Sequence, residues 1–562
     1  MSTDARATLE HSSATTFIDV NNNDPNEKID PDALKNVNTK DTLNDEAQNN
    51  GQIKVQLSKV KLIMVIIGLS LGFFVATLDQ TIVATALPKI SSDFNALDHI
   101  TWVATSYLLT TTALQPTYGK ISDIFGRKAT FLFAITLFEI GSLLCGLSSN
   151  MVSLIIFRAI AGLGGGGIIP LVLIIVSDIV PPQDRGKYQG MVGGTYGISS
   201  VVGPLLGGVF TDHLTWRWVF FINIPIGALT IVVIIILLRM PRPEGSIRQK
   251  IKRIDYLGTI VMILTIVALL FPLSLGGNEY AWNSPVIIVL LVVGFVGCFL
   301  FALVEVKFSV EPIAPPHLFK SVNVIANLSA LFFHGMTFYG LIYYIPVYFQ
   351  VIKGDSATKS GLELIPYILG VVLASISTGQ LMSRSDIASY RTITIFGGVL
   401  ITVGSGLLTL WNEHTGKGEQ IGYMIITGTG VGIILQSTLI CGQQIVDYKD
   451  VAVITSLLTF FRTVGSVFGV TIIGTTFKNV LIRNLNELSL PYDISMAVRQ
   501  SANAVQDLPD DMKFLVITAY VNALRAAFMI LIPVGLLCTI SATFMGNHKP
   551  ERSEKETVVV FE

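Results

Sequence analysis

Two long apolar stretches of this sequence are joined by Gly119-Lys-Ile-Ser-Asp-Ile-Phe-Gly-Arg-Lys128. This segment places four charged side chains and two glycines within ten residues. The apolar stretches, near 100–118 and 129–147, approach the roughly 20 residues that a helix needs to cross a bilayer core. Short loops rich in Lys and Arg usually stay on the cytoplasmic side of a membrane. The segment therefore predicts two membrane-spanning helices joined by a tight cytoplasmic turn.

The composition indicates a polytopic membrane protein. Hydrophobic residues make up 51% of the chain and charged residues only 14%, whereas soluble domains have about 25% charged residues. The mean hydropathy is +0.62. The net charge is −1, and most charged residues lie in the tails and loops. Such a balance gives no reason to expect a nucleic-acid partner. We expect most of this chain to be embedded in the lipid bilayer.

The bilayer-length rule predicts fourteen helical spans. They lie near 62–86, 100–118, 129–147, 151–175, 187–211, 218–238, 255–275, 285–306, 323–346, 361–382, 392–411, 420–441, 450–476 and 515–545. The second of these is rich in threonine and the last contains Arg525. We expect an all-α polytopic membrane protein with two six-helix bundles and two further helices inserted between them.

The spans divide the chain into five parts. These are a disordered cytoplasmic tail (1–60), an N-terminal six-helix bundle (61–238), a basic linker with two inserted helices (239–322), a C-terminal six-helix bundle with a long outer loop at 478–513 (323–546), and a cytoplasmic tail (547–562). Lys and Arg gather in the first tail, in the loop at 119–128 and after the sixth span. This bias predicts that both termini are cytoplasmic.

Two charged residues, Asp79 and Arg158, fall inside apolar spans of the first half within recognisable segments. Asp79 belongs to Leu78-Asp-Gln-Thr-Ile-Val-Ala-Thr-Ala-Leu-Pro88, and Arg158 belongs to Leu154-Ile-Ile-Phe-Arg-Ala-Ile-Ala-Gly-Leu-Gly164. An aspartate at the centre of a spanning helix costs about 2.5 to 3.5 kcal/mol on insertion scales, so it needs a partner, a cavity or a proton. Both residues are predicted to lie roughly 6 to 8 Å from the bilayer mid-plane on the same side. Their similar depth allows an ion pair.

These segments resemble those of the major facilitator superfamily of transporters. Gly119, Asp123, Gly126, Arg127 and Lys128 match its signature loop. The segments around Asp79 and Arg158, and others across residues 60 to 480, resemble the fungal fourteen-helix drug:proton antiporter branch, which also includes vacuolar basic amino acid transporters. The other segments are 197–208, which contains Gly203, Pro204 and Gly207, and 216–227, 343–350, 360–366 and 460–465.

The resemblance implies roles for several of these residues. Asp79 and Arg158 would couple transport to protons, since arginine keeps its own proton but can hold a neighbouring carboxylate ionised. Asp178 would pair with Arg127 in one conformation and release it in another, although it could also be an ordinary solvated helix end. The glycines and proline at 203–207 would let their helix pack closely and bend.

Five residues are candidates for the substrate cavity: Gln80, His334, Tyr339, Tyr343 and Arg462. His334 and Arg462 fall near the centres of their spans, where ionisable residues are often functional. His334 could equally be a hydrogen-bonded structural residue. The tyrosines could surround an organic cation, or they could belong to the aromatic belt at the membrane surface.

Other classes of protein fit less well. Gly162–Gly167 matches a dinucleotide-binding pattern, but no preceding strand or βαβ unit accompanies it, and close helix packing explains the glycines better. The four cysteines are far apart within apolar spans, so we expect neither a metal site nor a disulfide framework. We expect no cofactor, no P-loop nucleotide site and no enzymatic activity.

Together with the residues above, the resemblance implies a monomeric, proton-coupled antiporter that moves drugs or other small toxic compounds out of the cytosol, and antiport rests on the resemblance around Gly203 and Pro204. An alternative within transport is vacuolar import of basic amino acids, which would need carboxylates to hold the extra cation. Few acids are available for that: Asp79, Glu139 and Glu363. A membrane sensor without transport activity is a more remote alternative. The plasma membrane and the vacuolar membrane both remain open as locations.

Overall fold

The computed structural model describes most of the chain beyond the first tail. The described residues are 55–56, 58–94, 96, 100–241, 243–277, 280–384, 389–488, 491, 494–496, 498, 505–506, 508–546 and 559–560. Most of the predicted tail at 1–60 and of the tail at 547–562 lies outside them. Within them, helices dominate, which confirms the predicted fold class, and two-residue strands β1 (Val55–Gln56) and β2 (Val559–Val560) pair in parallel.

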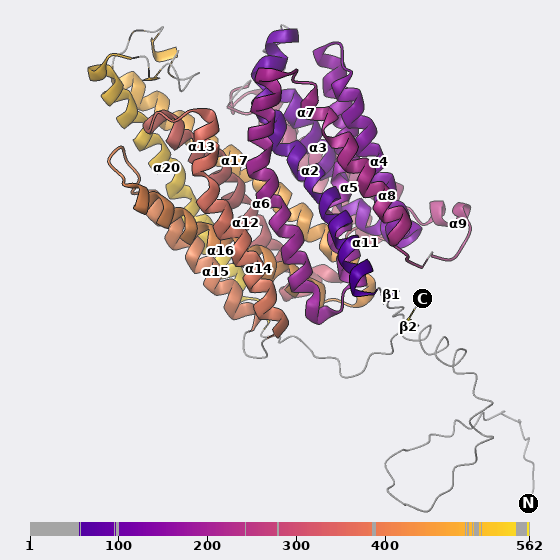
Figure 1. Ribbon diagram of the computed structural model, residues 1–562. Coiled ribbons are helices and arrows are strands. Elements are labelled where there is room, and N and C mark those ends of the chain that lie inside the picture. Colours follow the sequence, from indigo (N-terminus) through magenta and orange to yellow (C-terminus); the bar gives the residue numbers. More distant parts are fainter. Residues whose placement is uncertain are drawn as a thin grey trace, which may run out of the picture. The chain divides into compact units, whose positions relative to one another are not determined.

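Seven helices precede the basic linker (Figure 1). They are α2 (Lys59–Phe94), α3 (Ile100–Phe125), α4 (Arg127–Gly146), α5 (Met151–Ile179), α6 (Pro182–His213), the short α7 (Trp218–Phe221) and α8 (Asn223–Leu237). Helix α5 begins at a capping box, in which the side chains of Asn150 and Ser153 each accept a hydrogen bond from the other's backbone N–H. Helices α4 and α3 both pack against α5, and α2 packs against α6.

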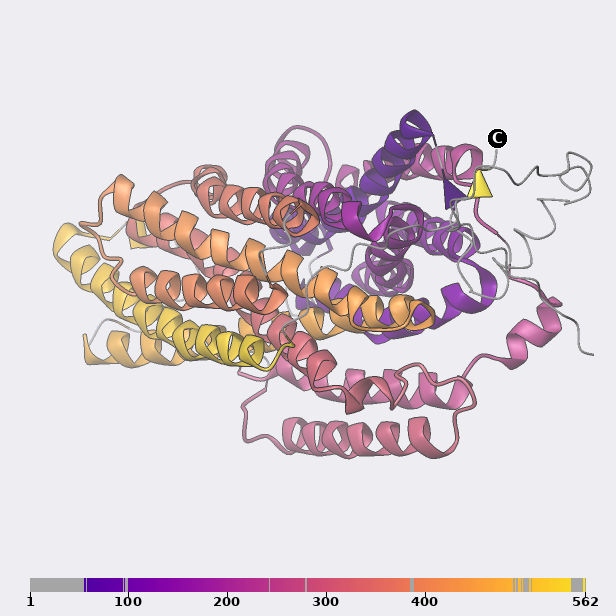
Figure 2. The ribbon, with the colours of Figure 1, turned by 90° about the horizontal axis from the view of Figure 1, so that it is seen from below.

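The linker holds a short helix, α9 (Ile247–Lys252), and leads to the inserted pair, α10 (Tyr256–Leu275) and α11 (Pro285–Lys307). The side chains of Asp255 and Ser284 cap these two helices by accepting hydrogen bonds from backbone N–H groups. Figure 2 shows the inserted pair side by side at the edge of the helices. Helix α11 has the highest hydropathy of the twelve apolar helices and buries little of itself, as expected for a helix that faces lipid.

The second half begins with the 3₁₀ turn η2 (Leu318–Lys320). Its helices are α12 (Val322–Val347), the π-helical turn η3 (Tyr348–Ile352), α13 (Ala357–Glu363), α14 (Ile365–Arg384), α15 (Tyr390–Leu408), α16 (Lys417–Gln444), the 3₁₀ turn η4 (Tyr448–Asp450), α17 (Val451–Glu487) and α20 (Asp510–Thr543). Helices α14 and α15 both pack on α16, and α12 packs on α17.

Twelve helices within the described residues are long and apolar enough to cross a membrane. Helices α3 and α6 are not among the twelve, although they have 26 and 32 residues. Both occupy predicted spans and are more polar, because they carry the threonine-rich and glycine-rich segments of the sequence. Fourteen spans therefore remain our prediction for this fold.

The predicted outer loop at 478–513 needs corrected boundaries. Helix α17 continues to Glu487 and helix α20 begins at Asp510, so both ends of the predicted loop are helical. The reason is an apolar pair four residues apart, Leu481 and Leu485, which are 4% and 1% exposed. Residues at this spacing share one helix face, so their burial extends the helix past the charged side chains that had suggested a loop.

Candidate functional site

A buried ion pair joins Asp79 and Arg158, which the sequence places at similar depth within two apolar spans. Arg158 on α5 donates from Nη1 to Oδ2 of Asp79 on α2, and the two atoms are 2.6 Å apart. The side chain of Asp79 is 0% exposed and that of Arg158 is 2% exposed. Away from water, such a pair is strong only while both partners are present. The structure thus brings together Asp79 and Arg158, as their similar predicted depth allowed.

Neighbouring groups satisfy the rest of this pair. Nδ2 of Asn223 donates to Asp79 Oδ1 at 3.3 Å and to the hydroxyl of Ser142 at 2.9 Å. The Arg158 guanidinium also donates from Nε to the carbonyl oxygen of Val103 at 3.1 Å and lies over the ring of Tyr107, 4.3 Å from its centroid. The cation therefore keeps favourable contacts when the carboxylate is neutral.

Three consecutive residues of α2 contact three different helices. Asp79 binds Arg158 on α5. Gln80 accepts a hydrogen bond from Tyr339 on α12, at 3.4 Å, and Thr81 donates to the carbonyl oxygen of Ser199 on α6, at 3.2 Å. Successive residues of a helix point about 100° apart, so one turn can reach all three neighbours. Gln80, which contacts the second half of the chain, is thus the immediate neighbour of Asp79.

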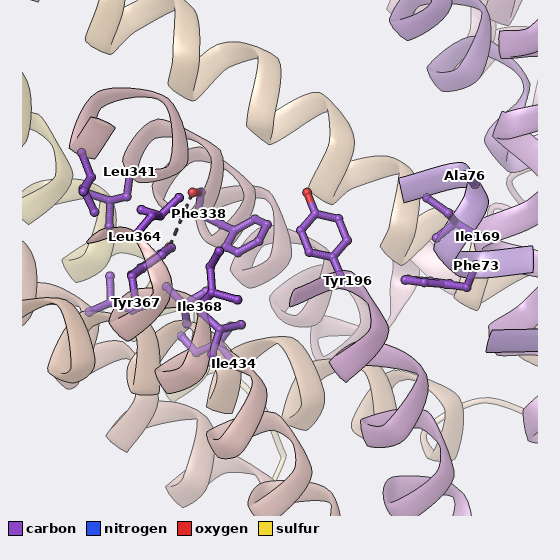
Figure 3. Packing of buried hydrophobic residues seen from close by; sticks show 14 of the residues in the cluster. Phe73, Ala76, Ile169, Tyr196, Phe338, Leu341, Leu364, Tyr367, Ile368 and Ile434 are labelled. Carbon is purple, nitrogen blue, oxygen red and sulfur yellow. Dashed lines mark hydrogen bonds between the residues drawn. The ribbon is translucent and has the colours of Figure 1, made fainter. Parts of the chain in front are cut away.

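A tyrosine pair connects the two halves at this level. The hydroxyl of Tyr196 on α6 donates to the hydroxyl of Tyr339 at 2.9 Å. Figure 3 shows Tyr196 extending from its helix between the cluster around Phe338 and the residues Phe73 and Ala76 of α2. The rings of Tyr196 and Phe338 have centroids 5.3 Å apart. This contact places an aromatic, hydrogen-bonding surface between the halves.

The other substrate-cavity candidates lie on α12 and α17. His334 is fully buried, and its ring stacks on Phe338 with centroids 5.8 Å apart, so it has the packing of a structural residue. Tyr343 lies one helical turn from Tyr339 and is half exposed. Arg462 is partly buried and lies within electrostatic reach of Tyr196 and His334. Gln80, Tyr339, Tyr343 and Arg462 are at least partly exposed, whereas His334 is buried, and all five stay predictions for the substrate cavity.

Of the two further acids considered for a basic substrate, Glu363 is paired, whereas the carboxylate oxygens of Glu139 have no hydrogen-bond partner among the described residues. Glu139 on α4 is 9% exposed and packs against Gly227 on α8, where a Cβ would lie 1.7 Å from its Oε1. Glu363 on α13 forms an ion pair with Lys417, 3.6 Å away. Neither carboxylate lies beside the pair of tyrosines, as judged from the described contacts.

The loop at 119–128 is closed by ion pairs. Arg127 donates from Nε to Asp178 Oδ2 at 2.9 Å, and from Nη1 to Asp123 Oδ1 at 2.5 Å and to the hydroxyl of Ser122 at 2.7 Å. Asp178 lies at the end of α5, so the structure forms the pair with Arg127 that the resemblance implied. Gly126 has a φ of 96°, a backbone conformation that favours glycine. The turn is shorter than predicted: α3 extends to Phe125 and α4 begins at Arg127, so Gly126 is the only residue of 119–128 outside a helix.

Lys128 and Gly119 connect this segment to helices α8 and α17. Lys128 donates from Nζ to the carbonyl oxygens of Ile235 and Leu238 at the end of α8, at 2.8 and 2.7 Å. A Cβ at Gly119 would lie 2.5 Å from Ser456 Oγ and 2.9 Å from the carbonyl oxygen of Ala452. Glycine is therefore required for α3 to approach α17 in the second half.

More contacts join the halves at the end of the helices that carries this loop, here called the loop end. The backbones of Gly186 on α6 and Gly379 on α14 touch, since a Cβ at Gly186 would lie 2.3 Å from the carbonyl oxygen of Gly379. Nε2 of Gln189 donates to Oε1 of Gln443 on α16 at 2.9 Å. The two halves are thus in direct contact at the loop end.

The predicted flexible motif lies on α6 beside Asp79. A Cβ at Gly203 would lie 2.1 Å from Oγ1 of Thr81, and one at Gly207 would lie 2.6 Å from the carbonyl oxygen of Ile82. Pro204 lies within the same helix, where it removes one backbone hydrogen bond. The glycines therefore let α6 pack closely on the helix that carries the ion pair.

Two adjacent glycines offer a matched test of this packing. A Gly207→Ala variant should unfold at lower temperature and export more slowly, because its Cβ meets a backbone carbonyl and overpacking costs about 1 to 3 kcal/mol. A Gly208→Ala variant should keep wild-type behaviour, since nothing lies within 4 Å of its Cβ. Thermal unfolding and transport of both purified variants check this. Equal losses in the two variants would refute the packing argument.

A surface ion network ties the loop to the inserted pair. Glu311, between α11 and α12, binds Lys120 at 3.1 Å and Arg253 at 2.6 Å. The hydrogen bond from Arg253, with help from Lys120, lowers the pKa of Glu311 below its ordinary value of 4.5. A lowered pKa in the folded protein means that the carboxylate stabilises the fold at neutral pH. That contribution disappears as the pH falls below 4.5 and through the lowered value.

A Glu311→Gln variant should reveal this dependence. At pH 7 it should be less stable than the wild type by up to about 1 kcal/mol, the usual range for partly exposed ion pairs. The difference should shrink below pH 4.5, where Glu311 itself becomes protonated. Thermal unfolding at both pH values measures it, with Glu244→Gln on the same linker, an exposed residue, as control. A difference that grows at low pH would contradict the assignment.

Several residues at the site escaped the sequence analysis. Asn223 belongs to one of the recognised segments, but its spacing from Asp79 gave no sign of contact. Tyr196, Gln189 and Gln443 carried one usable signal: each is a polar side chain within a long apolar or glycine-rich helix. Such residues usually need a buried partner, yet the sequence does not indicate which one.

The fold and this site define a class: a polytopic membrane transporter, with a buried ion pair in one half and a polar contact to the other. The model of the Major Facilitator Superfamily matches residues 69–470. The chain therefore belongs to this superfamily, and the resemblance seen in the sequence is confirmed. It is a multi-pass integral membrane transporter and not an enzyme.

Known relatives agree with this assignment. The chain is 39% identical over 491 residues to the MFS-type efflux pump MFS1 of Arthroderma benhamiae, covering 86% of this chain and 91% of that one. It is 35% identical over 493 residues to the aspyridones efflux protein of Neocamarosporium betae, covering 86% and 87%. The human organic anion transporter MFSD10 (TETRAN) shares the fold at a TM-score of 0.55 and 12% identity, covering 85% of this chain and 99% of that chain.

Proposed function

We propose that this transporter is a proton-coupled antiporter that moves small organic compounds out of the cytosol. The observation that carries the proposal is the fully buried pair of Asp79 and Arg158. Arginine keeps its proton at any ordinary pH, so the aspartate is the member of the pair that can take up and release one. A titratable group held inside a transporter helix is a natural site for proton coupling.

Protonation at Asp79 would change the balance between two conformations. Neutralising the carboxylate removes most of its attraction for Arg158, and breaking a buried ion pair costs about 3 to 5 kcal/mol. The next residue, Gln80, contacts Tyr339 in the second half, at 3.4 Å. A shift of α2 on protonation would therefore alter the contact between the halves. In the proposed cycle, a proton enters from the outer side as the substrate leaves and is released toward the cytosol.

The loop end is proposed to face the cytosol, following the distribution of Lys and Arg. The contacts at Gly119, Gly186 and Gln189 hold the halves together at this end. Opening it to the cytosol would require these contacts to separate. The pair of Arg127 and Asp178 lies beside them and is well placed to release in the opposite conformation.

The proposed substrates are organic compounds, not basic amino acids. The two relatives described above bear efflux pump names, and one of them is named for aspyridones. A basic amino acid would need a carboxylate for its side-chain charge, but Asp79 binds Arg158 and Glu363 binds Lys417. Glu139 has no such partner, but it is only 9% exposed and lies against Gly227 of α8. The tyrosines at 196, 339 and 343 instead suit aromatic or cationic molecules. We further propose that the protein acts as a monomer in the plasma membrane.

Transport by the purified protein in sealed vesicles tests this proposal. An imposed pH gradient should drive accumulation of a cationic dye such as rhodamine 6G, and collapse of the gradient with an ionophore should stop it. Radiolabelled lysine and arginine should not accumulate. Accumulation of the two amino acids without dye transport would overturn the substrate class and indicate vacuolar storage. Dye accumulation at the same rate with and without the pH gradient would overturn proton coupling.

A further inference from the structure

A cavity of about 500 Å³ lies between the inserted pair and the rest of the helices. Helices α10 and α11 form one wall of the cavity, and α3, α17 and the segment before α12 form the other. Side chains such as Leu269, Phe301 and Phe460 make its lining largely apolar. This volume lies within the range of about 300 to 1,000 Å³ found for sites that hold drug-sized ligands.

One carboxylate lines this cavity. Glu305 on α11 is 4% exposed, and its Oε2 accepts a hydrogen bond from the backbone N–H of Ala314 at 3.1 Å. Its Oε1 has no hydrogen-bond partner among the described residues, and the same holds for Oδ2 of Asp255. These two oxygens lie 3.0 and 2.3 Å from the point where a Cβ on Gly258 would be. Two partnerless carboxylate oxygens thus lie close together, and one of them belongs to Glu305, which lines the apolar cavity.

Among the described residues, no cation forms an ion pair with this carboxylate, although Lys120 lies within electrostatic reach of it. Lys120 and Arg253 both bind Glu311, at 3.1 and 2.6 Å. Burial of a carboxylate without a cation or further hydrogen-bond donors is costly, so such a group either takes up a proton or pairs with a cationic ligand. The cavity therefore combines an apolar surface with a carboxylate that can bind a positively charged group.

The layout of the cavity matches an elongated amphipathic molecule. Glu305 lies near the loop end of α11, and Cys298, which also lines the cavity, lies seven residues away, or about 10 Å along the helix. Cys298 and Val306 are exposed, so this lining continues onto the side of the inserted pair that faces lipid. A charged group would bind at the loop end and an apolar body would extend toward the bilayer interior.

We propose that this cavity binds an amphipathic organic cation, with Glu305 holding the charge and the apolar walls of α10, α11 and α17 holding the body. This inference rests on the proposed function and deepens it, because it names lipophilic cations drawn from the bilayer as a class of cargo. A phospholipid fits less well, since its phosphate would be repelled by the carboxylate near the same end. The site is separate from Asp79 and Tyr339.

Cys298 provides a native reporter for occupation of this cavity. It lines the cavity and is exposed, whereas Cys145, Cys441 and Cys538 are buried. The probe is tetraphenylphosphonium, added to the full-length protein in lipid nanodiscs before a membrane-permeant maleimide. Labelling of the Cys298 peptide is followed by mass spectrometry. At ten times the dissociation constant, bound cation should slow labelling about ten-fold.

Three variants decide the outcome. Glu305→Gln keeps an acceptor for Ala314 but removes the charge, so protection should require at least about ten-fold more cation. Glu244→Gln, an exposed residue on the linker, should leave protection unchanged. Asp79→Asn should also keep protection, even where transport is lost, which separates failure of this site from failure of the proposed function. Unprotected Cys298 in the wild type would overturn the proposal. Equal protection in Glu305→Gln would also overturn it, because the apolar walls would then bind the cation without the carboxylate.

Discussion

An Asp79→Asn variant should lose export driven by a pH gradient, with the gradient-dependent part of the rate falling about a hundred-fold. Asparagine can still accept the hydrogen bond from Arg158 but cannot ionise, so it imitates the permanently protonated state. The Arg158 guanidinium keeps its contacts with Val103 and Tyr107. The variant should therefore remain folded and continue to exchange substrate between the two sides of a vesicle when no gradient is imposed.

Counterflow of dye in vesicles without a pH gradient is the control for folding and binding. It should persist in Asp79→Asn, and pH-driven accumulation should be partly retained in Asp79→Glu, which keeps a carboxylate at the same position. Full pH-driven transport by Asp79→Asn would remove Asp79 from the coupling mechanism. Loss of counterflow together with the pH response would mean that the substitution damaged the fold, and the Glu variant would then decide whether a carboxylate is needed.

The ion pair could be anticipated because depth along a helix follows directly from the sequence. Asp79 and Arg158 lie at similar distances from the centres of their spans, and each breaks an apolar segment that gives it no other partner. Depth alone does not say which way a side chain points, because that depends on the rotation of each helix about its own axis, which the sequence does not give. The structure supplies it, together with the hydrogen bond from Asn223 at 3.3 Å that completes the carboxylate environment.

Contacts between the halves could not be anticipated in the same way. Gln189 and Gln443 are 254 residues apart, and each could reach any of several neighbouring helices. Glycines at 186 and 379 allow close approach but carry no information about which helix approaches. The order of the helices in the membrane decides these pairs. The superfamily resemblance predicted that order only in outline, as two bundles with an inserted pair.

Gly119→Leu should prevent the two halves from closing at the loop end. Its side chain would need the space held by Ser456 and the carbonyl oxygen of Ala452, at 2.5 and 2.9 Å from the Cβ position. Overpacking of this kind costs about 1 to 3 kcal/mol, which shifts a two-state equilibrium by about five-fold to a hundred-fold. The conformation open at the loop end would then predominate, and export would fall because the transporter rarely completes its cycle.

A cysteine at position 189 would report this shift. Gln189 is 1% exposed in the closed loop end, so Gln189→Cys should react slowly with a water-soluble maleimide in an otherwise wild-type background and faster when Gly119→Leu is added. Gly422→Ala is the matched control, since nothing lies within 4 Å of its Cβ and labelling should stay slow. Unchanged labelling in the Gly119→Leu background would show that the loop end closes by other contacts. Faster labelling with retained export would show that the transport cycle does not require close contact between α3 and α17 at Gly119. The loop end would then still open and close without that contact.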